Sequence, residues 1–326
     1  MAAAAATPLL VVLTGPTGSG KSQCAMQLVQ LLAPQVPVEI VSVDSAQVYR
    51  GMDIGTAKPE RALRARVPHH LIDVRDPSQS YSAGDFVREA RAVIAGIHAR
   101  GALPLLVGGT MLYLHALRNG LAPLPQASPE IRQQIDALAA AHGWAAVHAQ
   151  LAAVDARAAA RIAPQDTQRL QRALEVYRLT GVPISQWQER TPAAREQYRW
   201  LRYALWPASR EQLRQHLQDR FDAMLRAGLI AEVRVLYQRG DLTLRHASMR
   251  AVGYRQLWPY CAGEVSIESA TAAAVLATAQ LAKRQLTWLR RERELTLLGD
   301  TSVGALEALA AQISASGGAD RCSLRC

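Results

Sequence analysis

Short apolar runs alternate with helical patterns along the first 120 residues of the chain. Three runs rich in leucine and valine, Leu9–Thr14, residues 38–43 and Leu103–Val107, are typical of buried parallel strands. A helical pattern over residues 83–100 separates the second run from the third. The alternation predicts an α/β fold, a three-layer core around a mostly parallel sheet.

The strand pattern disappears between residues 120 and 200. Residues 128–130, Ser-Pro-Glu, provide an N-cap, a proline at the first helical position and an acid in the first turn, so a helix is predicted to begin there and to stop at Gly143. Asp155 and Asp166 are expected to cap two further helices. These alanine-rich segments predict a small all-helical domain, residues 122–197, inserted into the core.

Strand-like sequence returns at residues 198–206. Ser209 and Gln212 have the spacing of a capping box and predict the start of the next helix. Two more helices are expected to lead to a final basic helix over about residues 278–297.

The predicted catalytic core therefore comprises residues 1–121 and 198–300. Residues 301–326 are expected to form a C-terminal tail, with a weakly held helix at residues 305–313 before a partly disordered end that is rich in Gly and Ser.

Composition is that of a soluble globular protein, with 49% hydrophobic and 20% charged residues among 326. No apolar run approaches membrane-spanning length, and the alanine-rich start lacks the basic flank of a signal peptide. We therefore expect a cytoplasmic protein, a monomer without membrane contact. The four cysteines lack paired spacing, so neither a zinc site nor a disulfide framework is predicted.

The positive charge is concentrated in the second half of the chain. Of the formal net charge of +10, residues 1–160 contribute +2 and residues 161–326 contribute +8. Clusters of basic residues are often only solvated helix faces, but here Tyr254, Trp258 and Trp288 are interleaved with them. This combination favours a polyanionic partner.

A complete phosphate loop, G-x-x-x-x-G-K-[ST], follows the first apolar run. In such loops, typical of ATP- and other nucleotide-binding proteins, backbone N–H groups and the N-terminus of the next helix surround a phosphate group. Lys21 would reach the outer phosphates, and the Ser22 hydroxyl would bind Mg²⁺. The predicted phosphate-binding residues are Gly15, Pro16, Thr17, Gly18, Ser19, Gly20, Lys21 and Ser22.

Two other strand ends carry polar residues. Asp44 follows the second run, and Gly108, Gly109 and Thr110 follow the third. Because ligands bind beyond the carboxyl ends of parallel strands, Asp44 is expected beside the phosphate loop as a helix cap, a magnesium carboxylate or a general base. Thr110 can cap the next helix and donate to phosphate, or it can simply belong to a turn.

These features alone leave several functions open. A kinase of a small metabolite, with Asp44 as base towards a hydroxyl, fits the phosphate loop. So does a regulatory NTPase that binds nucleic acid without modifying it covalently.

Six segments in order resemble the tRNA dimethylallyltransferase family. They are GPTGSGKS, VDSAQVYRGMDIGTAKP, LLVGGTMLYLHAL, QRLQRALEVYRLTG, SMRAVGYRQLW and AQLAKRQLTWLRRE. The chain is similar to the bacterial form, because no Cys/His zinc-finger extension is present.

The resemblance implies that N6 of the adenosine at position 37, beside the tRNA anticodon, attacks C1 of dimethylallyl diphosphate and releases pyrophosphate. It implies that the phosphate loop binds this diphosphate and that Mg²⁺, through Ser22, is the cofactor. It implies catalytic roles for Asp44 as the base that receives the N6 proton, Thr110 at the reaction centre and Arg220 on the diphosphate.

The resemblance also implies contacts with the anticodon stem-loop of tRNA. The matching residues are Asp44, Ser45, Ala46, Gln47, Thr110, Arg132, Gln168, Arg169, Leu170, Gln171, Arg172, Arg250, Ala251, Val252, Gly253, Tyr254, Arg255, Lys283, Arg284, Gln285, Leu286, Thr287, Trp288, Leu289 and Arg290.

Overall fold

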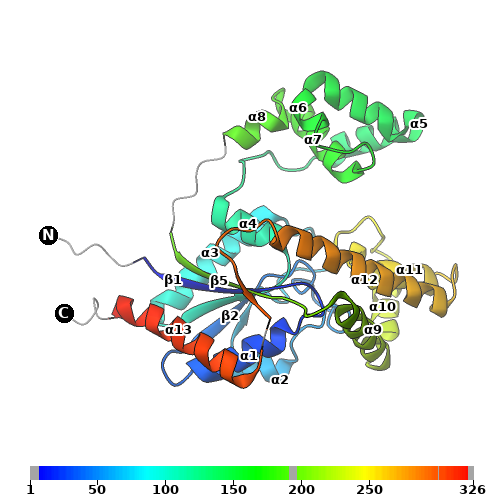
Figure 1. Ribbon diagram of the computed structural model, residues 1–326. Coiled ribbons are helices and arrows are strands. Elements are labelled where there is room, and N and C mark those ends of the chain that lie inside the picture. Colours follow the sequence, from blue (N-terminus) through cyan, green and yellow to red (C-terminus); the bar gives the residue numbers. More distant parts are fainter. Residues whose placement is uncertain (1–6, 191–196, 300, 322–326) are drawn as a thin grey trace. The chain divides into compact units, whose positions relative to one another are not determined.

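A computed structural model describes residues 7–190, 197–299 and 301–321, the last five by their backbone alone. It divides into two compact units, Met1–His115 with Glu196–Cys326, and Ala116–Arg195. In chain order (Figure 1) the elements are β1 (Leu9–Thr14), α1 (Lys21–Leu32), β2 (Val38–Ser42), α2 (Arg61–Arg66), β3 (His69–His70), α3 (Ala83–Ala99), β4 (Leu103–Val107), α4 (Met111–Asn119), α5 (Pro129–Val154), α6 (Ala156–Ala159), α7 (Thr167–Thr180), α8 (Ile184–Glu189), β5 (Arg199–Leu205), α9 (Arg210–Arg226), α10 (Leu229–Gln238), η1 (Ser248–Arg250), α11 (Tyr254–Cys261), α12 (Ile267–Leu289), β6 (Thr296–Leu298) and α13 (Val303–Arg321).

The larger unit contains one six-stranded sheet in the order β3-β2-β4-β1-β5-β6. All the strand pairs described are parallel, with Leu13 of β1 opposite Val107 of β4 and Tyr203 of β5. Because the strands are parallel, the carboxyl ends of β1, β2 and β4 lie at one edge of the sheet. The predicted three-layer α/β core is confirmed.

Helices α1 and α13 cover one face of this sheet (Figure 1). Alternate residues of the strands point to that face, including Val11 and Leu105, and pack in one cluster with Leu28 of α1. From α13, Leu306 and Ile313 are each 1% exposed in the same cluster. The helix predicted at residues 305–313 is longer in the structure, and its apolar stripe packs in this core cluster. Residues 322–326 of the predicted tail lie outside the described residues.

Helix α3 lies on the opposite face, against β2 and β4. Its buried side chains, Phe86, Ala90, Ile94 and Ile97, follow helical spacing along one stripe. Ser82 and Asp85 form a complete capping box at its start. On β5 the same side of the sheet is completed by the end of α12, where Leu289 packs in a cluster with Ala204.

The predicted basic helix over residues 278–297 is wrong in its bounds. Helix α12 begins at Ile267, where the Ser266 side chain caps it, and ends at Leu289. Residues Thr296–Leu298 instead form the edge strand β6, paired with β5. The basic residues of this region therefore divide between the helix and the loop after it.

The smaller unit is helical in its described part and has its own core of buried residues, among them Ile135, Leu151 and Leu170. Gly143 breaks α5 with φ +77°, as predicted, but helix resumes at once and continues to Val154. Asp155 and Asp166 accept backbone N–H groups at the starts of α6 and α7, so both predicted caps are confirmed. In the part of the chain described, no helix has the length and apolar character needed to cross a bilayer.

Candidate active site

The loop between β1 and α1 has the geometry of an anion cradle. Gly15, Gly18 and Gly20 all have positive φ, and a Cβ at Gly15 would lie 2.9 Å from the Leu205 carbonyl oxygen. No side chain caps the start of α1, and its first turn holds no acidic residue. Among the described residues, the buried Ser19 hydroxyl has no hydrogen-bond partner. An anion would satisfy the Ser19 hydroxyl and the uncapped N–H groups at the start of α1.

Lys21 projects from the start of α1 into this cradle. Its Nζ donates to the Pro16 carbonyl oxygen at 2.6 Å. Burial and the nearby charge of Arg220 lower the pKa of Lys21 to about 7, although Asp44 acts in the opposite direction. The ammonium is therefore poorly solvated, and an anionic ligand would stabilise its charged form.

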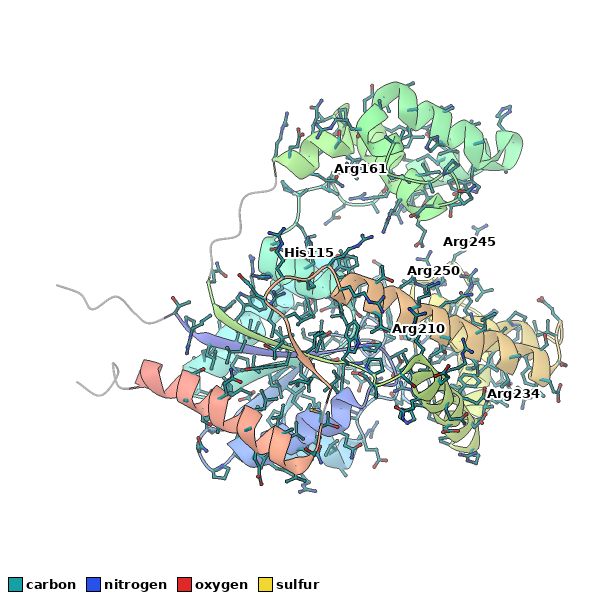
Figure 2. The ribbon with its side chains drawn as sticks, viewed as in Figure 1. His115, Arg161, Arg210, Arg234, Arg245 and Arg250 are labelled. Atoms are coloured by element: carbon teal, nitrogen blue, oxygen red, sulfur yellow. The ribbon has the colours of Figure 1, made fainter. Side chains whose placement is uncertain are left out.

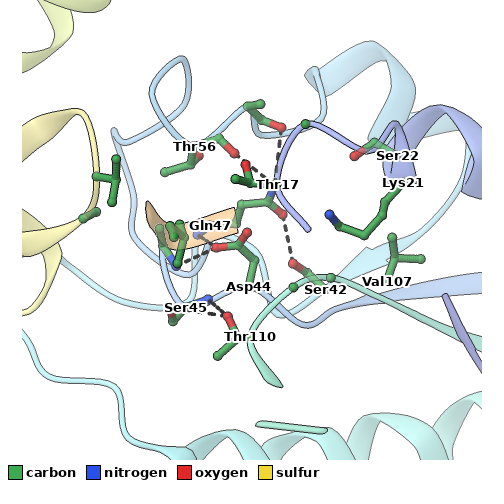
Figure 3. A pocket seen from close by; sticks show the side chains of 18 of the residues that line it. Thr17, Lys21, Ser22, Ser42, Asp44, Ser45, Gln47, Thr56, Val107 and Thr110 are labelled. Atoms are coloured by element: carbon green, nitrogen blue, oxygen red, sulfur yellow. Dashed lines mark hydrogen bonds between the residues drawn. The ribbon is translucent and has the colours of Figure 1, made fainter. Parts of the chain in front are cut away.

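Asp44 lies at the end of β2, close to these cations. Its Oδ1 accepts the N–H groups of Ala46 at 2.8 Å and Gln47 at 3.3 Å, which orients the carboxylate. The Ser45 N–H donates to the Thr110 hydroxyl at 3.0 Å. Figure 3 shows Asp44, Ser45, Gln47 and Thr110 grouped together, with the ammonium of Lys21 pointing into the same space.

Arg220 on α9 is the second cation of the site. It is half-buried, and burial lowers the pKa of its guanidinium, while the charge of Asp44 raises it. It makes no hydrogen bond or ion pair with any described residue, although it lines the same cavity as Lys21 and Asp44. The structure thus brings together the three charged residues that the sequence placed in different segments.

One cavity of about 750 Å³ contains this arrangement. Its walls belong to the larger unit and combine the phosphate loop with segments at residues 44–47, 55–57, 108–112, 217–224, 247–253 and 278–288. Gly108 is required by close packing, since a Cβ there would lie 2.1 Å from the Val43 carbonyl oxygen. The cavity is large enough for an extended ligand that reaches from the phosphate loop towards Asp44.

Glu232 on α10 supports two walls of the cavity and was not predicted from the sequence. Its carboxylate accepts the N–H groups of Asp53, Ile54 and Gly55 at 2.8 to 3.1 Å, and it accepts the hydroxyl of Tyr254 at 2.5 Å. No local motif marks this residue, because the backbone N–H groups that it accepts lie about 180 positions earlier in the chain.

The segment held by Glu232 in turn orients Gln47. The side-chain amide of Gln47 donates to the carbonyl oxygens of Thr56 and Ala57, both at 3.3 Å. Its oxygen accepts the hydroxyl of Ser42 at 2.9 Å. Lys58, with its side chain 1% exposed, holds the end of this segment through Asp53 and the Tyr49 carbonyl oxygen. The walls beside Asp44 are thus fixed by buried polar contacts.

Several expected RNA contacts are exposed basic residues. Arg250, Arg255, Lys283, Arg284 and Arg290 are all exposed. Arg245 and Arg250, labelled in Figure 2, belong to the segment of the chain that joins α10 to α11. These residues belong to the larger unit and are available to a polyanion.

Four other expected RNA contacts have buried side chains in this structure. Leu170 and Tyr254 are 0% exposed, Leu289 is 2% and Leu286 is 7%. Each follows an exposed residue by one or a few positions, so a continuous segment on a helix includes the inward-facing positions as well. These four side chains stabilise the helices that present their neighbours.

Arg132 and Arg172, in the smaller unit, have an internal partner. Both pair with the fully buried carboxylate of Glu175, at 2.9 and 2.7 Å. Glu175 also accepts the Ser128 N–H at 2.9 Å. Within the same unit, Gln168 and Arg169 are exposed, and Gln171 donates to Asp136. The two arginines were predicted to bind RNA, but Arg132 also joins α5 to α7, and Arg172 joins α7 to the Pro125 carbonyl oxygen before α5.

The residues of this site could bind magnesium only together with oxygen atoms of a ligand. The structure describes no group of three His, Cys, Asp or Glu residues able to hold a metal ion. Ser22 is exposed and lines the cavity that also contains the Asp44 carboxylate. Oxygen donors of this kind suit Mg²⁺ when phosphate oxygens supply the remaining ligands.

Comparison with solved structures shows the same architecture in known enzymes. The eukaryotic dimethylallyltransferase acting on tRNA aligns over 98% of this chain and 80% of its own, with a TM-score of 0.74 and 28% sequence identity. The full-length tRNA isopentenylpyrophosphate transferase of Bacillus halodurans aligns over 95% of this chain and 98% of its own, with a TM-score of 0.67 and 35% identity.

Curated relatives are more similar in sequence. A tRNA dimethylallyltransferase of Thioalkalivibrio sulfidiphilus is 57% identical over 87% of this chain and 88% of its own. One from Methylococcus capsulatus is 52% identical over 96% of this chain and 99% of its own. The model of the family described as IPP transferase matches residues 47–292. With this match and these identities over most of its length, the chain belongs to the IPP transferase family.

Proposed function

We propose that this protein transfers the dimethylallyl group of dimethylallyl diphosphate to N6 of the adenosine at position 37 of tRNA, next to the anticodon. The observation that carries the proposal is one cavity that holds the phosphate loop, Lys21, Arg220 and the Asp44 carboxylate. Relatives that share half or more of the sequence are named tRNA dimethylallyltransferase.

The reaction is a substitution at C1 of the prenyl group. The N6 lone pair forms the new C–N bond, the C1–O bond breaks, and pyrophosphate leaves with the bonding electrons. Asp44 receives the N6 proton, and the N–H groups of Ala46 and Gln47 orient its carboxylate for that transfer.

Charge develops on the departing diphosphate oxygens. Lys21, Arg220 and the free donors of the phosphate loop stabilise that charge in a buried site, where electrostatic interactions are strong. Magnesium, when bound, would be held by Ser22 and diphosphate oxygens and would neutralise part of the same charge. Thr110 is hydrogen-bonded to Ser45 and borders the reaction centre beside Asp44.

The second partner is the anticodon stem-loop. Its target base must leave the stack to reach Asp44, and the exposed arginines and lysine of the larger unit would hold the surrounding phosphates. We propose that the protein acts as a monomer in the cytoplasm.

Replacement of Asp44 tests the proposal. Asp44→Asn should lower the rate of prenyl transfer by about 10² to 10⁴, the usual contribution of a positioned base, with binding of dimethylallyl diphosphate and tRNA retained. Asp219→Asn, an exposed carboxylate on α9, is the matched control and should transfer at the normal rate. A near-normal rate in Asp44→Asn excludes the base, and a loss of diphosphate binding identifies a magnesium carboxylate instead.

Thermal unfolding distinguishes this function from a kinase. A ligand that binds the folded state raises the melting temperature. Dimethylallyl diphosphate should protect the protein, and protection by ATP alone would favour phosphoryl transfer.

A further inference from the structure

Gln285 lies within the stretch of α12 expected to contact RNA, but its side chain reaches the phosphate loop. Its Oε1 accepts the N–H of Thr17 at 2.8 Å. Its Nε2 donates to the carbonyl oxygen of Gly109, also at 2.8 Å. One amide therefore joins the loop after β1 to the loop after β4.

These two loops follow neighbouring strands. Leu13 at the end of β1 is paired with Val107 at the end of β4, so the loops leave the sheet side by side. Both line the cavity, with the diphosphate cradle on one side and Thr110 on the other. The link made by Gln285 sets the spacing between the phosphate loop and the reaction centre.

The orientation of Gln285 follows from its place on the helix. Lys283 and Arg284 are exposed, whereas Gln285 is half-buried and Leu286 is buried. Successive residues of an α-helix point about 100° apart, so one turn presents charges outward and an amide inward. The packing around the amide is close, because a Cβ on Gly109 would lie 2.5 Å from Gln285 Nε2.

The amide group is suited to this position because it donates and accepts at once. A carboxylate of the same length would accept from Thr17 but would place negative charge against the Gly109 carbonyl oxygen. A shorter side chain cannot span both partners. The chemistry of the contact thus requires glutamine itself, independently of any RNA.

We propose that Gln285 is a positioning residue for the diphosphate loop and that its neighbours, not Gln285 itself, bind RNA. The inference rests on the proposed function for the identity of the anion. It assigns the inner face of α12 to the diphosphate site and leaves the outer face to tRNA.

Binding measurements on single variants test this assignment. Inorganic pyrophosphate is titrated calorimetrically into the full-length wild-type, Gln285→Ala and Lys283→Ala proteins, and tRNA binding is measured separately. Gln285→Ala should weaken pyrophosphate binding by about fivefold to twentyfold, the effect of losing hydrogen bonds that hold the loop, and should leave tRNA affinity unchanged. Lys283→Ala, two residues away and exposed outside the cavity lining, should show the reverse pattern.

A second variant guards against a general folding defect. Gly109→Ala puts a methyl group against Nε2 and should displace Gln285, with the same loss of pyrophosphate affinity. In the double variant Gly109→Ala/Gln285→Ala the contact with Nε2 is absent and only a 3.2 Å contact with the Gly15 carbonyl oxygen remains, so the combined loss should be well below the sum of the two single losses. Additive losses would show that the residues act separately and would overturn the proposal.

The outcomes also separate this inference from the proposed function. If the wild-type protein does not bind pyrophosphate, the proposed diphosphate site is wrong. If it binds and Gln285→Ala binds equally well, only the inference about Gln285 fails. Loss of tRNA affinity in Gln285→Ala, alone or together with pyrophosphate, would make Gln285 an RNA contact and refute the assignment.

Discussion

The lowered pKa of Lys21 predicts that diphosphate binding depends on pH. In the free protein, burial and Arg220 hold this pKa near 7, well below its ordinary value of 10.5. At pH 8 most of these side chains would therefore be neutral. A diphosphate places several negative charges beside Nζ, which favours the ammonium form and raises the pKa.

The sign and size of the pH dependence follow from the difference between the pKa of Lys21 in the free protein and in the complex. Because the bound state has the higher pKa, binding takes up a proton wherever Lys21 is neutral in the free protein. Above pH 7 the affinity should fall with a slope that approaches tenfold per pH unit, or about 1.4 kcal/mol. The slope should persist until the pH approaches the pKa of Lys21 in the complex.

Calorimetry with dimethylallyl diphosphate between about pH 7.5 and 9.5 measures both the affinity and the proton uptake. The phosphate oxygens of the ligand are already ionised in this range, since the second pKa of a phosphate monoester is about 6. Titrations in two buffers of different ionisation enthalpy should reveal uptake approaching one proton. Lys21→Arg is the matched control, since guanidinium stays charged, and its affinity should be nearly independent of pH. A flat profile in the wild-type protein, or an equal slope in the control, would refute the reasoning.

Three further predictions concern other parts of the molecule. Replacing Lys283 and Arg284 together by alanine should reduce the salt dependence of tRNA binding by roughly one to two units of slope, measured by filter binding, and an unchanged slope would mean a merely solvated face. Glu232→Gln should raise the KM for tRNA several-fold but hardly change the KM for dimethylallyl diphosphate. In Glu232→Asp the KM for tRNA should rise less. Equal effects on both KM values would argue against a role confined to the cavity wall that Glu232 supports. Arg132→Ala should destabilise the folded protein by about 1–3 kcal/mol in thermal denaturation, because it removes a charged hydrogen bond from the buried Glu175, and an unchanged melting temperature would show that the pair contributes nothing.

The pKa of Glu175 gives that last contact a pH dependence. The hydrogen bonds from Arg132 and Arg172 lower this pKa below 4.5, although burial acts against them. The stabilisation is thus fully present above pH 4.5 and is lost as pH falls through the folded-state pKa. In Arg132→Ala, the acid side of the stability profile should be flatter than in the wild-type protein.

Local patterns were sufficient to predict the centre of the sheet. Leu9–Thr14 and Leu103–Val107 were predicted with their observed bounds, because buried parallel strands are continuous apolar runs between turn residues. The two-residue strand β3 and the three-residue strand β6 were missed. Such short strands are defined by pairing with a distant neighbour, which periodicity along the chain does not contain.

The end of α12 and the final helix show the same limit. Basic residues continue from Lys283 past the end of the helix at Leu289, so the charge pattern alone extended the predicted helix too far. Glu294 has a positive φ of 56°, which marks the change of direction before β6. In α13 the apolar residues looked weakly held, because the surface that buries them comes from β1 and α1.

The residues of the site also divide into those that local sequence predicts and those that it does not. Lys21, Asp44 and Thr110 follow strands within a few residues, and parallel strands bring their carboxyl ends together, so local sequence predicted that they would meet. Glu232 and Gln285 act on backbone atoms 178 and 268 positions away, and nothing near them in sequence marks those contacts.

A contiguous motif on a helix therefore needs to be divided by the direction of each side chain before roles are assigned. In the stretch that contains Lys283, Gln285 and Leu286, one residue is exposed, the next reaches the phosphate loop, and the third lies in the core. All three can be required for prenyl transfer, yet they should fail in different assays: tRNA binding, diphosphate binding and thermal stability. Rates of the overall reaction would not separate these causes, whereas the two substrate affinities and the melting temperature, measured on the same variants, would.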